Sequence, residues 1–470
     1  MVNLIVYGGV KEIGGNKILL EDGNTKIFID FGVSFSRRGK FFEEFLTPRT
    51  ANGIGDFLIM KLIPDIKGIY REDLLTHFGR RAEEPDIAAV ILSHAHADHA
   101  NYVSFLHKGI PIYCGETCKS ILEAVDEQSQ RNIESEVCNF RERPLFRSDY
   151  SKPPIERTFK TFRTGHKIKI DSIEIEPIHV DHSVPGAYGF LVWTSEGAVA
   201  YTGDLRLHGT HPEMTKEFIE RAKKAKPIAM ITEGTRIDID HTDESEDKVF
   251  EEAKREVINN NGMTIVDFNF KDVDRFRTFY KIACETEKKL VISFKHACFL
   301  ERYYKDTQLD VPDSTGENIF LLKPKLRTGT YCVEDYTDDY IENRLDYPNI
   351  LVAKDITKNP EEYMVVLNFW YFNTLVDLNP DRGLYIHSLS EPFNEEMEMS
   401  YERMQNWLNH FNLRFIQAHC SGHICGAELK EMVKTIHPKT LFPIHTEHPN
   451  LFINLSSKMQ MVEEGKAYQL

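Results

Sequence analysis

The chain has 470 residues, of which 41% are hydrophobic and 28% charged, an ordinary balance for a folded globular protein. This length predicts more than one domain. The net charge of -16 excludes a uniformly basic nucleic-acid coat but allows a local groove or neutralisation by metal. The eight cysteines are scattered without paired C-x-x-C spacing and are predicted to be reduced thiols. With no signal peptide and no apolar run of about 18 residues, the sequence predicts a cytoplasmic protein without a membrane segment.

The N-terminal third is predicted to form short strands joined by turns. Apolar runs at residues 4–7, 17–20 and 26–31 each stop at a turn that contains glycine. Residues 34–85 are polar and punctuated by glycine, which predicts a long excursion that contributes walls to a cleft. Residues 126–163 are interpreted as an inserted segment without an assigned role. A helix is expected at 101–108, and further strands are expected at 110–113, 168–170, 173–178, 187–193 and 198–201.

A turn rich in metal-ligating side chains follows the apolar run 88–92. The sequence Ser93-His94-Ala95-His96-Ala97-Asp98-His99 places three imidazoles and a carboxylate within six residues. Nitrogen and oxygen donors from one tight turn suit two adjacent metal ions better than one. A solvated polar turn is the alternative interpretation, and donors elsewhere in the chain decide between the two.

Such donors stand at the ends of other predicted strands. If the strands share a sheet edge, these side chains meet the His-rich turn. His179 is interpreted as structural and His448 as a non-ligand. The donors that follow apolar runs are Asp30, His182, Asp204 and His445.

The second half of the chain alternates helices with strands from about residue 238 onward. Helices alternating with strands predict a doubly wound parallel sheet. The expected helices are 243–259, 272–286 and 395–411, and the expected strands are 263–268, 289–294, 350–353, 363–367, 383–387 and 414–417.

The order of these motifs resembles the metallo-β-lactamase superfamily, and the late insertion is similar to that of the β-CASP nucleases. Within that group, Gly8 to Asn16 and Ile29-Asp30-Phe31-Gly32 resemble the ribonuclease J family, in a short archaeal-type form without the bacterial C-terminal domain. The resemblance implies an α/β fold, in which a metallo-β-lactamase αββα sandwich carries an inserted β-CASP domain with a parallel sheet flanked by helices. The implied parts are 1–236 and 395–470 for the metallo-β-lactamase domain and 237–394 for the insertion.

The family pattern also implies a ligand set for two metal ions. One ion is expected on His94, His96 and His182, and a second on Asp98, His99 and His445. Asp204 is expected to bridge the two, while Asp30 holds the turn without touching metal. The implied cofactors are two Zn²⁺ ions, with Mn²⁺ or Mg²⁺ as alternatives.

The resemblance implies roles for further residues. Asp98 is the expected proton acceptor, and His423 is expected to protonate the leaving group while Glu233 orients it. The expected substrate-binding residues are Ser388, Ser390, Ser421 and Gly422. The family's S-Q-G-E-P loop is matched to residues 388–392, where its glycine is missing, and this departure bears on 5′-end recognition.

The implied function is a zinc-dependent ribonuclease that cleaves single-stranded RNA by a two-metal-activated hydroxide, as a 5′-to-3′ exonuclease, an endonuclease or both. Two alternatives stay open: a non-catalytic scaffold subunit of an RNA-processing complex and a small-molecule metallo-hydrolase. A homodimer is also left open.

Overall fold

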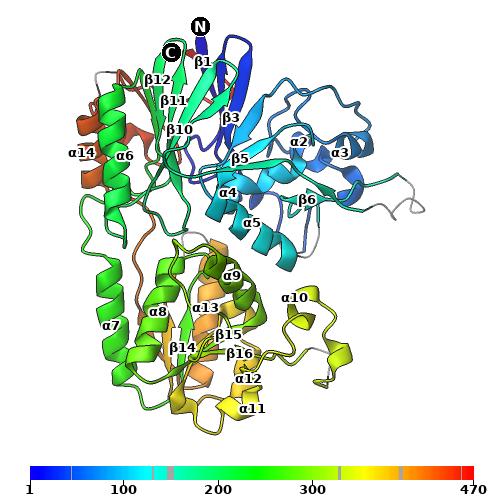
Figure 1. Cartoon of the computed structure of the whole chain (residues 1–470), viewed down its shortest axis with the longest axis vertical. Helices are drawn as coiled ribbons and strands as arrows, with labels where there is room; N and C mark the ends of the chain where they lie inside the picture. The colour runs from blue at the N-terminus through cyan, green and yellow to red at the C-terminus, as the bar shows by residue number, and fades with distance from the viewer. Residues whose placement is uncertain (44, 130–131, 146–152, 327–329, 391–394, 457) are drawn as a thin grey trace. The chain divides into compact units, whose positions relative to one another are not determined.

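The computed structural model describes residues 1–470 except 44, 130–131, 146–152, 327–329, 391–394 and 457. The described chain divides into two compact units (Figure 1). We call residues 1–242 together with 422–470 the host unit, and residues 243–421 the inserted unit. None of the helices in the described ranges is both long and apolar enough to cross a bilayer.

Two β-sheets form the centre of the host unit. The first has the strand order β22-β1-β2-β3-β4-β5-β8, and the second has the order β21-β13-β12-β11-β10-β9. The strands of the first sheet are β1 (Val2–Gly8), β2 (Lys17–Asp22), β3 (Thr25–Phe31), β4 (Ala89–Ile91), β5 (Ile112–Gly115), β8 (Phe159–Phe162) and β22 (Ala467–Gln469). Those of the second are β9 (Ile168–Ile170), β10 (Ile173–His179), β11 (Tyr188–Thr194), β12 (Gly197–Tyr201), β13 (Ala229–Thr232) and β21 (Thr440–Pro443).

The two sheets pack face to face through alternating apolar side chains. Val2, Leu4 and Val6 of β1 point to the same buried core as Val199 and Tyr201 of β12. The other face of the second sheet is covered by α6 (Pro212–Ala225) and α14 (Gly426–Ile436), which contribute to a separate apolar cluster. Helix α5 (Glu116–Gln128) packs against β5 and β8 of the first sheet. The layers therefore follow the αββα order expected from the sequence.

The excursion 34–85 and the inserted segment 126–163 both contain local structure. The excursion 34–85 forms α1 (Phe35–Arg38), η1 (Thr50–Asn52), α2 (Gly55–Ile59) and α3 (Glu72–His77), and residues 126–163 contain the paired strands β6 (Asn139–Phe140) and β7 (Ile155–Glu156). The buried carboxylate of Asp126 accepts backbone N–H groups from residues 137, 138 and 139 at 3.0–3.2 Å. A hydrogen-bonded carboxylate thus fixes the start of the second segment.

The inserted unit contains a sheet whose strands pair in parallel, in the order β17-β16-β15-β18-β14-β19-β20. The strands are β14 (Thr264–Asp267), β15 (Lys289–Ser293), β16 (Ile319–Leu322), β17 (Ile350–Leu351), β18 (Tyr363–Val366), β19 (Leu384–His387) and β20 (Arg414–Gln417). The helices are α7 (Glu246–Ile258), α8 (Val273–Glu285), α9 (Phe294–Lys305), α10 (Asp339–Glu342), α11 (Ala353–Ile356), α12 (Thr374–Leu378) and α13 (Glu395–His410), with the 3-10 turns η4 (Val333–Asp335), η5 (Pro360–Glu362) and η6 (Phe369–Tyr371).

Three predictions from the sequence differ from the structure: the two ends of the insertion and the helix expected at 101–108. The insertion begins at residue 243 rather than 237, and it returns to the host after residue 421 rather than 394. The reason is that α13 and β20 belong to the inserted unit: β20 pairs with β19, and Met404 and Leu408 of α13 lie in that unit's apolar core. The helix expected at 101–108 is instead α4 (Ala97–Ala100) followed by the 3-10 turn η2 (Asn101–Phe105).

The two chain segments that join the host unit to the insertion lie side by side within the host. The N–H of Gly426 donates to the carbonyl oxygen of Ile239 at 2.7 Å, and the N–H of Ala427 donates to that of Asp240 at 3.1 Å. The outgoing and returning segments are therefore held together by backbone hydrogen bonds.

Candidate metal centre

The His-rich turn connects a buried strand to a short helix. Strand β4 ends at Ile91, and α4 begins at Ala97 with His96 at its N-cap. His94 lies in the loop between them, whereas Asp98 and His99 lie on the first turn of α4. Side chains alternate along a strand but lie on one face three or four residues apart on a helix. The change from strand to helix within the turn therefore lets these side chains point toward a common centre.

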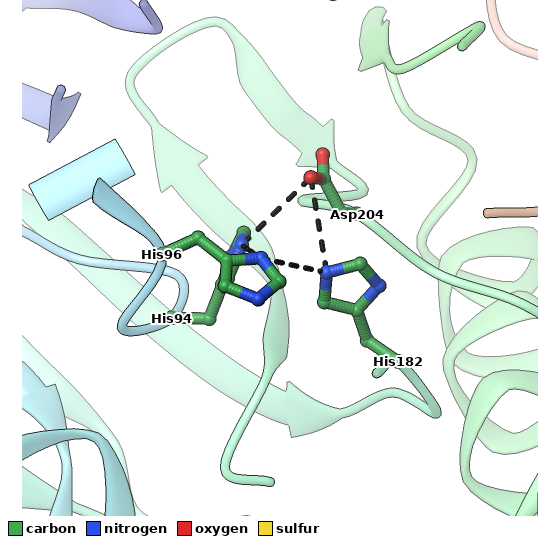
Figure 2. Close-up of side chains that lie close together, drawn as sticks. All are labelled: His94, His96, His182 and Asp204. Atoms are coloured by element: carbon green, nitrogen blue, oxygen red, sulfur yellow. Dashed lines mark hydrogen bonds and ion pairs between the residues drawn. The ribbon is translucent and has the colours of Figure 1, made fainter. Parts of the chain in front are cut away.

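The first cluster consists of three imidazoles and one carboxylate (Figure 2). Nδ1 of His96 lies 3.1 Å from Nε2 of His94 and 3.1 Å from Nε2 of His182. The Oδ2 atom of Asp204 lies 3.7 Å from Nε2 of His94 and 4.0 Å from Nε2 of His182. Nitrogens bound to a tetrahedral zinc ion at 2.0–2.1 Å lie roughly 3.3 Å apart, so this spacing suits coordination.

The second cluster lies next to the first and also includes Asp204. Nε2 of His445 is 3.2 Å from Oδ2 of Asp98 and 3.6 Å from Oδ2 of Asp204. Nε2 of His99 is 3.1 Å from the same Asp204 oxygen and 3.7 Å from Oδ2 of Asp98. One carboxylate oxygen therefore faces both clusters, which is the arrangement of a bridging ligand.

Two buried atoms in these clusters show that the residues fit metal ions. In the described part of the chain, Nε2 of His99 and Oδ1 of Asp204 have no hydrogen-bond partner of acceptable geometry. Buried polar atoms are normally hydrogen-bonded, so orphaned donor atoms at a convergence of ligands call for another partner. A divalent cation provides that partner for imidazole and carboxylate alike.

The remaining atoms of the ligands are held by neighbouring groups. Nδ1–H of His99 donates to Oδ2 of Asp30 at 2.8 Å, and that carboxylate also accepts the hydroxyl of Tyr201 at 2.6 Å. Its Oδ1 accepts the N–H of Ser93 at 2.7 Å. Asp30 adopts a left-handed φ of 57°, an uncommon conformation for a residue with a side chain. Asp30 thus contacts both Ser93 and His99 of the His-rich turn.

Two further contacts orient the imidazoles that come from distant strands. Nδ1–H of His182 donates to the carbonyl oxygen of Gly422 at 2.6 Å. Nδ1–H of His445 donates to the hydroxyl of Thr235 at 2.9 Å. Each bond fixes the tautomer in which Nε2 is the metal-facing nitrogen. Thr235 carries no sequence signal of this role, because threonine commonly ends strands.

The charge states of the two clusters differ. Burial lowers the pKa values of His94 and His182, so their imidazoles are neutral, the form that binds metal. Burial also disfavours the imidazolium of His99, but the carboxylates of Asp204, Asp98 and Asp30 outweigh it and raise the His99 pKa. A cation at the second cluster would take the place of that proton.

His423 and Glu233 form a hydrogen-bonded pair beside the clusters. Nδ1–H of His423 donates to Oε2 of Glu233 at 3.0 Å. The carboxylate is buried and also accepts the backbone N–H groups of Leu205 at 3.1 Å and Thr235 at 3.2 Å. Burial disfavours the imidazolium of His423, but the charges of Glu233, Asp204 and Asp98 together outweigh it and raise the His423 pKa to about 9. His423 is therefore protonated at neutral pH.

The residues expected to bind substrate differ in their surroundings. Ser388 is buried, and its hydroxyl contacts the carbonyl oxygen of Ala418 and the guanidinium of Arg275, so it holds the end of β19. Ser390 is exposed, whereas residues 391 and 392 of the matched loop lie outside the described residues. The N–H of Ser421 donates to Oε2 of Glu244 at 3.1 Å.

His179 and His448 lie outside both clusters. The ring of His179 stacks on Tyr188 with centroids 4.2 Å apart. Nε2 of His448 lies 3.8 Å from Oδ2 of Asp238, and both side chains are well exposed. Neither residue joins the ligands, as interpreted from the sequence.

Comparison with known proteins gives two family matches. Residues 64–243 match the model of a beta-lactamase superfamily domain, and residues 410–452 match that of a Zn-dependent metallo-hydrolase RNA specificity domain. The chain is therefore similar to ribonuclease J-like members of the metallo-β-lactamase superfamily. The inserted parallel sheet is the part that corresponds to its β-CASP group.

Curated relatives support this assignment along most of the chain. Ribonuclease J of Helicobacter pylori strain J99 is 23% identical over 95% of this chain, which spans 56% of that relative's length. Ribonuclease J of Mycoplasma genitalium is 22% identical over 94% of the chain and 68% of the relative. A crystal structure of a protein of unknown function from Enterococcus faecalis V583 superposes with a TM-score of 0.77 at 24% identity, covering both chains completely. That structure supports the fold alone.

Proposed function

We propose that the protein is a metal-dependent ribonuclease that hydrolyses phosphodiester bonds in single-stranded RNA. The observation that carries the proposal is the single Asp204 oxygen facing two donor clusters, with a protonated His423 beside them. The His423 ring centroid lies 5.2 Å from that of His182 and 5.7 Å from that of His445. A proton donor thus adjoins both potential ion sites.

We propose Zn²⁺ at both clusters, with Mn²⁺ or Mg²⁺ as alternatives. Five imidazoles among seven ligands favour zinc, since Mg²⁺ prefers oxygen ligands. When bound, two such ions lower the pKa of a water molecule and offset the charge on the phosphoryl oxygens. The ligands would be His94, His96 and His182 at one ion, Asp98, His99 and His445 at the other, and Asp204 at both.

The protein's own groups would manage the protons. Asp98 is the proposed acceptor of the proton from the attacking water, because its carboxylate lies in the second cluster. His423 is the proposed donor to the leaving oxygen. Glu233 holds Nδ1–H, so Nε2 of His423 is the nitrogen that we assign to proton transfer.

RNA as the substrate is supported by the RNA-specificity model and by the names of the relatives. Among the expected substrate-binding residues, we retain Ser390, Ser421 and the backbone of Gly422 and give Ser388 a positioning role. We propose that the enzyme acts as an exonuclease, an endonuclease or both, and the cleavage products distinguish the two modes. We also propose a cytoplasmic location and a homodimer.

The experiment uses RNAs with 5′-monophosphate, 5′-triphosphate or 5′-hydroxyl ends, each labelled at either end, with zinc or chelator present. Mononucleotides released only from monophosphorylated RNA indicate 5′-to-3′ exonuclease action, whereas internal fragments from all three indicate an endonuclease. The key variant is His423→Ala, with exposed His448→Ala as the matched control. We expect His423→Ala to retain both metal ions and to lose about 10²–10⁴-fold in turnover, while His448→Ala keeps full activity.

Two outcomes would contradict the proposal. Full cleavage by His423→Ala with confirmed metal content would remove His423 from the mechanism. An intact metal-loaded protein that cleaves none of the RNAs would favour the scaffold or the small-molecule hydrolase instead.

A further inference from the structure

A cavity of about 230 Å³ opens at the carboxyl end of the parallel sheet in the inserted unit. Its walls come from residues 293–296 at and after β15, residues near the end of β16 (322 and 324–326), residues at and after β18 (366–368, 371, 373 and 374), and residues 338, 340 and 341 at and within α10. This volume is near the lower end of ligand pockets, which run from roughly 300 to 1,000 Å³. It suits one nucleotide-sized ligand rather than a longer one.

The topology explains why the sheet is open at this point. Strands β15 and β18 are neighbours, but the chain leaves β15 for β16 on one side and leaves β18 for β19 on the other side. Connections that depart in opposite directions from adjacent parallel strands leave a crevice at their carboxyl ends, where open α/β sheets bind ligands. The cavity occupies this switch point.

Positive charge lines one part of the cavity. Lys295 lies on the first turn of α9, a twelve-residue helix whose N-cap Ser293 accepts the N–H of His296 at 3.2 Å. Lys325, an exposed residue after β16, adds a second ammonium group to the lining. Together with the partial positive charge of the helix N-terminus, these groups favour an anion such as a phosphate.

Aromatic rings from two separate elements flank Lys295. Its ammonium group lies 5.8 Å from the ring centroid of Tyr340 in α10 and 5.7 Å from that of Tyr371 in η6. The one carboxylate in the described lining, Asp338, hydrogen-bonds the Tyr340 hydroxyl. Tyrosine rings next to a cationic group provide stacking surfaces for a nucleobase, as in single-strand binding proteins.

Amide and apolar groups complete the lining. Asn368 and Asn373 contribute side-chain amides, which can recognise the edge of a base, and Leu322, Ile341 and Leu367 supply apolar walls. Apolar walls with a few polar groups are typical of small-molecule sites.

We propose that this cavity binds a nucleoside 5′-phosphate, with the phosphate at Lys295 and the N-terminus of α9 and the base against Tyr340 and Tyr371. The ligand's source is either a free mononucleotide or one nucleotide of an RNA strand. The site uses none of the metal-ligating or catalytic residues proposed above. Its occupancy therefore needs neither metal nor cleavage.

The test measures binding of AMP, UMP, adenosine and inorganic phosphate to the full-length, metal-stripped protein by isothermal titration calorimetry. We expect AMP to bind more tightly than adenosine. Lys295→Gln should lower the affinity for AMP by about 10-fold or more and change the affinity for adenosine little, because it removes a charge-assisted contact to phosphate. The matched control is Lys305→Gln, an exposed lysine at the other end of α9, which should bind AMP normally.

Further variants keep the test informative if Lys295→Gln folds poorly in thermal melting. Lys325→Gln alters an exposed side chain and should also weaken AMP binding. Tyr371→Leu should weaken the binding of AMP and of adenosine alike. Competition by hexa-adenylate that carries a 5′-phosphate, but not by the 5′-hydroxyl form, would identify an RNA end as the source. No competition by either oligonucleotide would identify a free nucleotide.

The proposal is overturned if AMP does not bind, or if it binds Lys295→Gln, Lys325→Gln and the wild-type protein equally. AMP binding that is lost in Asp204→Asn but kept in the lysine variants would place the nucleotide at the metal centre instead. Because these measurements exclude metal and catalysis, their failure leaves the proposed ribonuclease activity to its own experiment.

Discussion

Gly14 offers a test of how closely the N-terminal loop supports the metal centre. It has a φ of 78°, and a Cβ added there would lie 2.6 Å from Oδ2 and 2.7 Å from Cβ of Asp98. Gly23 provides a matched control, because its φ is 60° and an added Cβ would meet nothing within 4 Å. Alanine at either position pays a similar backbone penalty of about 1–2 kcal/mol, but only Gly14→Ala presses on a proposed ligand.

The size of the effect follows from the contact distances. Ordinary contacts begin at 3.4 Å, so Asp98 must retreat by about 0.7 Å, the difference between 3.4 and 2.7 Å. Metal–ligand distances tolerate changes of only about 0.2 Å. We therefore expect Gly14→Ala to lower zinc affinity at the cluster of Asp98, His99 and His445 by about 10–100-fold, similar to the loss of a group that orients a ligand.

The assay is a zinc titration of metal-stripped protein against a chromophoric chelator, with thermal melting to confirm folding. Gly14→Ala should show one binding step like the wild type and one weakened step, and Gly23→Ala should show both steps unchanged. Equal zinc affinities in all three proteins would refute the reasoning. Equal losses in the two variants would assign the effect to backbone strain instead.

Three other changes test separate parts of the structure. Thr235→Val removes the hydroxyl that holds His445 and should weaken zinc binding by about 10-fold in the same titration, while urea unfolding of the metal-free protein changes little. Asp126→Ala leaves the N–H groups of residues 137–139 without their carboxylate and should lower the free energy of unfolding by about 3 kcal/mol, measured in urea. Burial raises the pKa of Asp267 from 3.8 to about 7. The contribution of this carboxyl group to the free energy of unfolding therefore falls by up to about 4 kcal/mol as pH rises from 4 to 7. Asp267→Asn should therefore gain stability over the wild type with rising pH, and an unchanged difference between pH 4 and 8 would contradict that pKa.

The sequence placed several of the candidate ligands near one another because they follow a simple rule of sheet geometry, and the family resemblance implied the full set. Asp204 and His445 each follow a buried apolar strand, and parallel pairing of β12, β13 and β21 brings those strand ends to one edge. Short-range spacing within the His-rich turn then added four donors, and His182 follows strand β10.

The groups that support the ligands could not be predicted in the same way. Thr235 and Tyr201 act through hydroxyl contacts that depend on distances between segments far apart in the sequence. The return from the insertion was misplaced for a related reason. The apolar stripe of α13 indicates which helix face is buried but not which sheet covers it, and the sheet proved to be that of the inserted unit. Strand β16 was also not predicted from the sequence.

The paired segments at Ile239 and Gly426 have a consequence for the modularity of the chain. The segments that leave and re-enter the host unit are hydrogen-bonded neighbours. The whole insertion of 243–421 is therefore equivalent to a single loop of the host unit. The ends of that loop are already closed, so its length adds little entropic cost to folding of the host. The sandwich and its seven proposed ligands can therefore keep one architecture while the insertion at this position is lengthened, exchanged or redesigned.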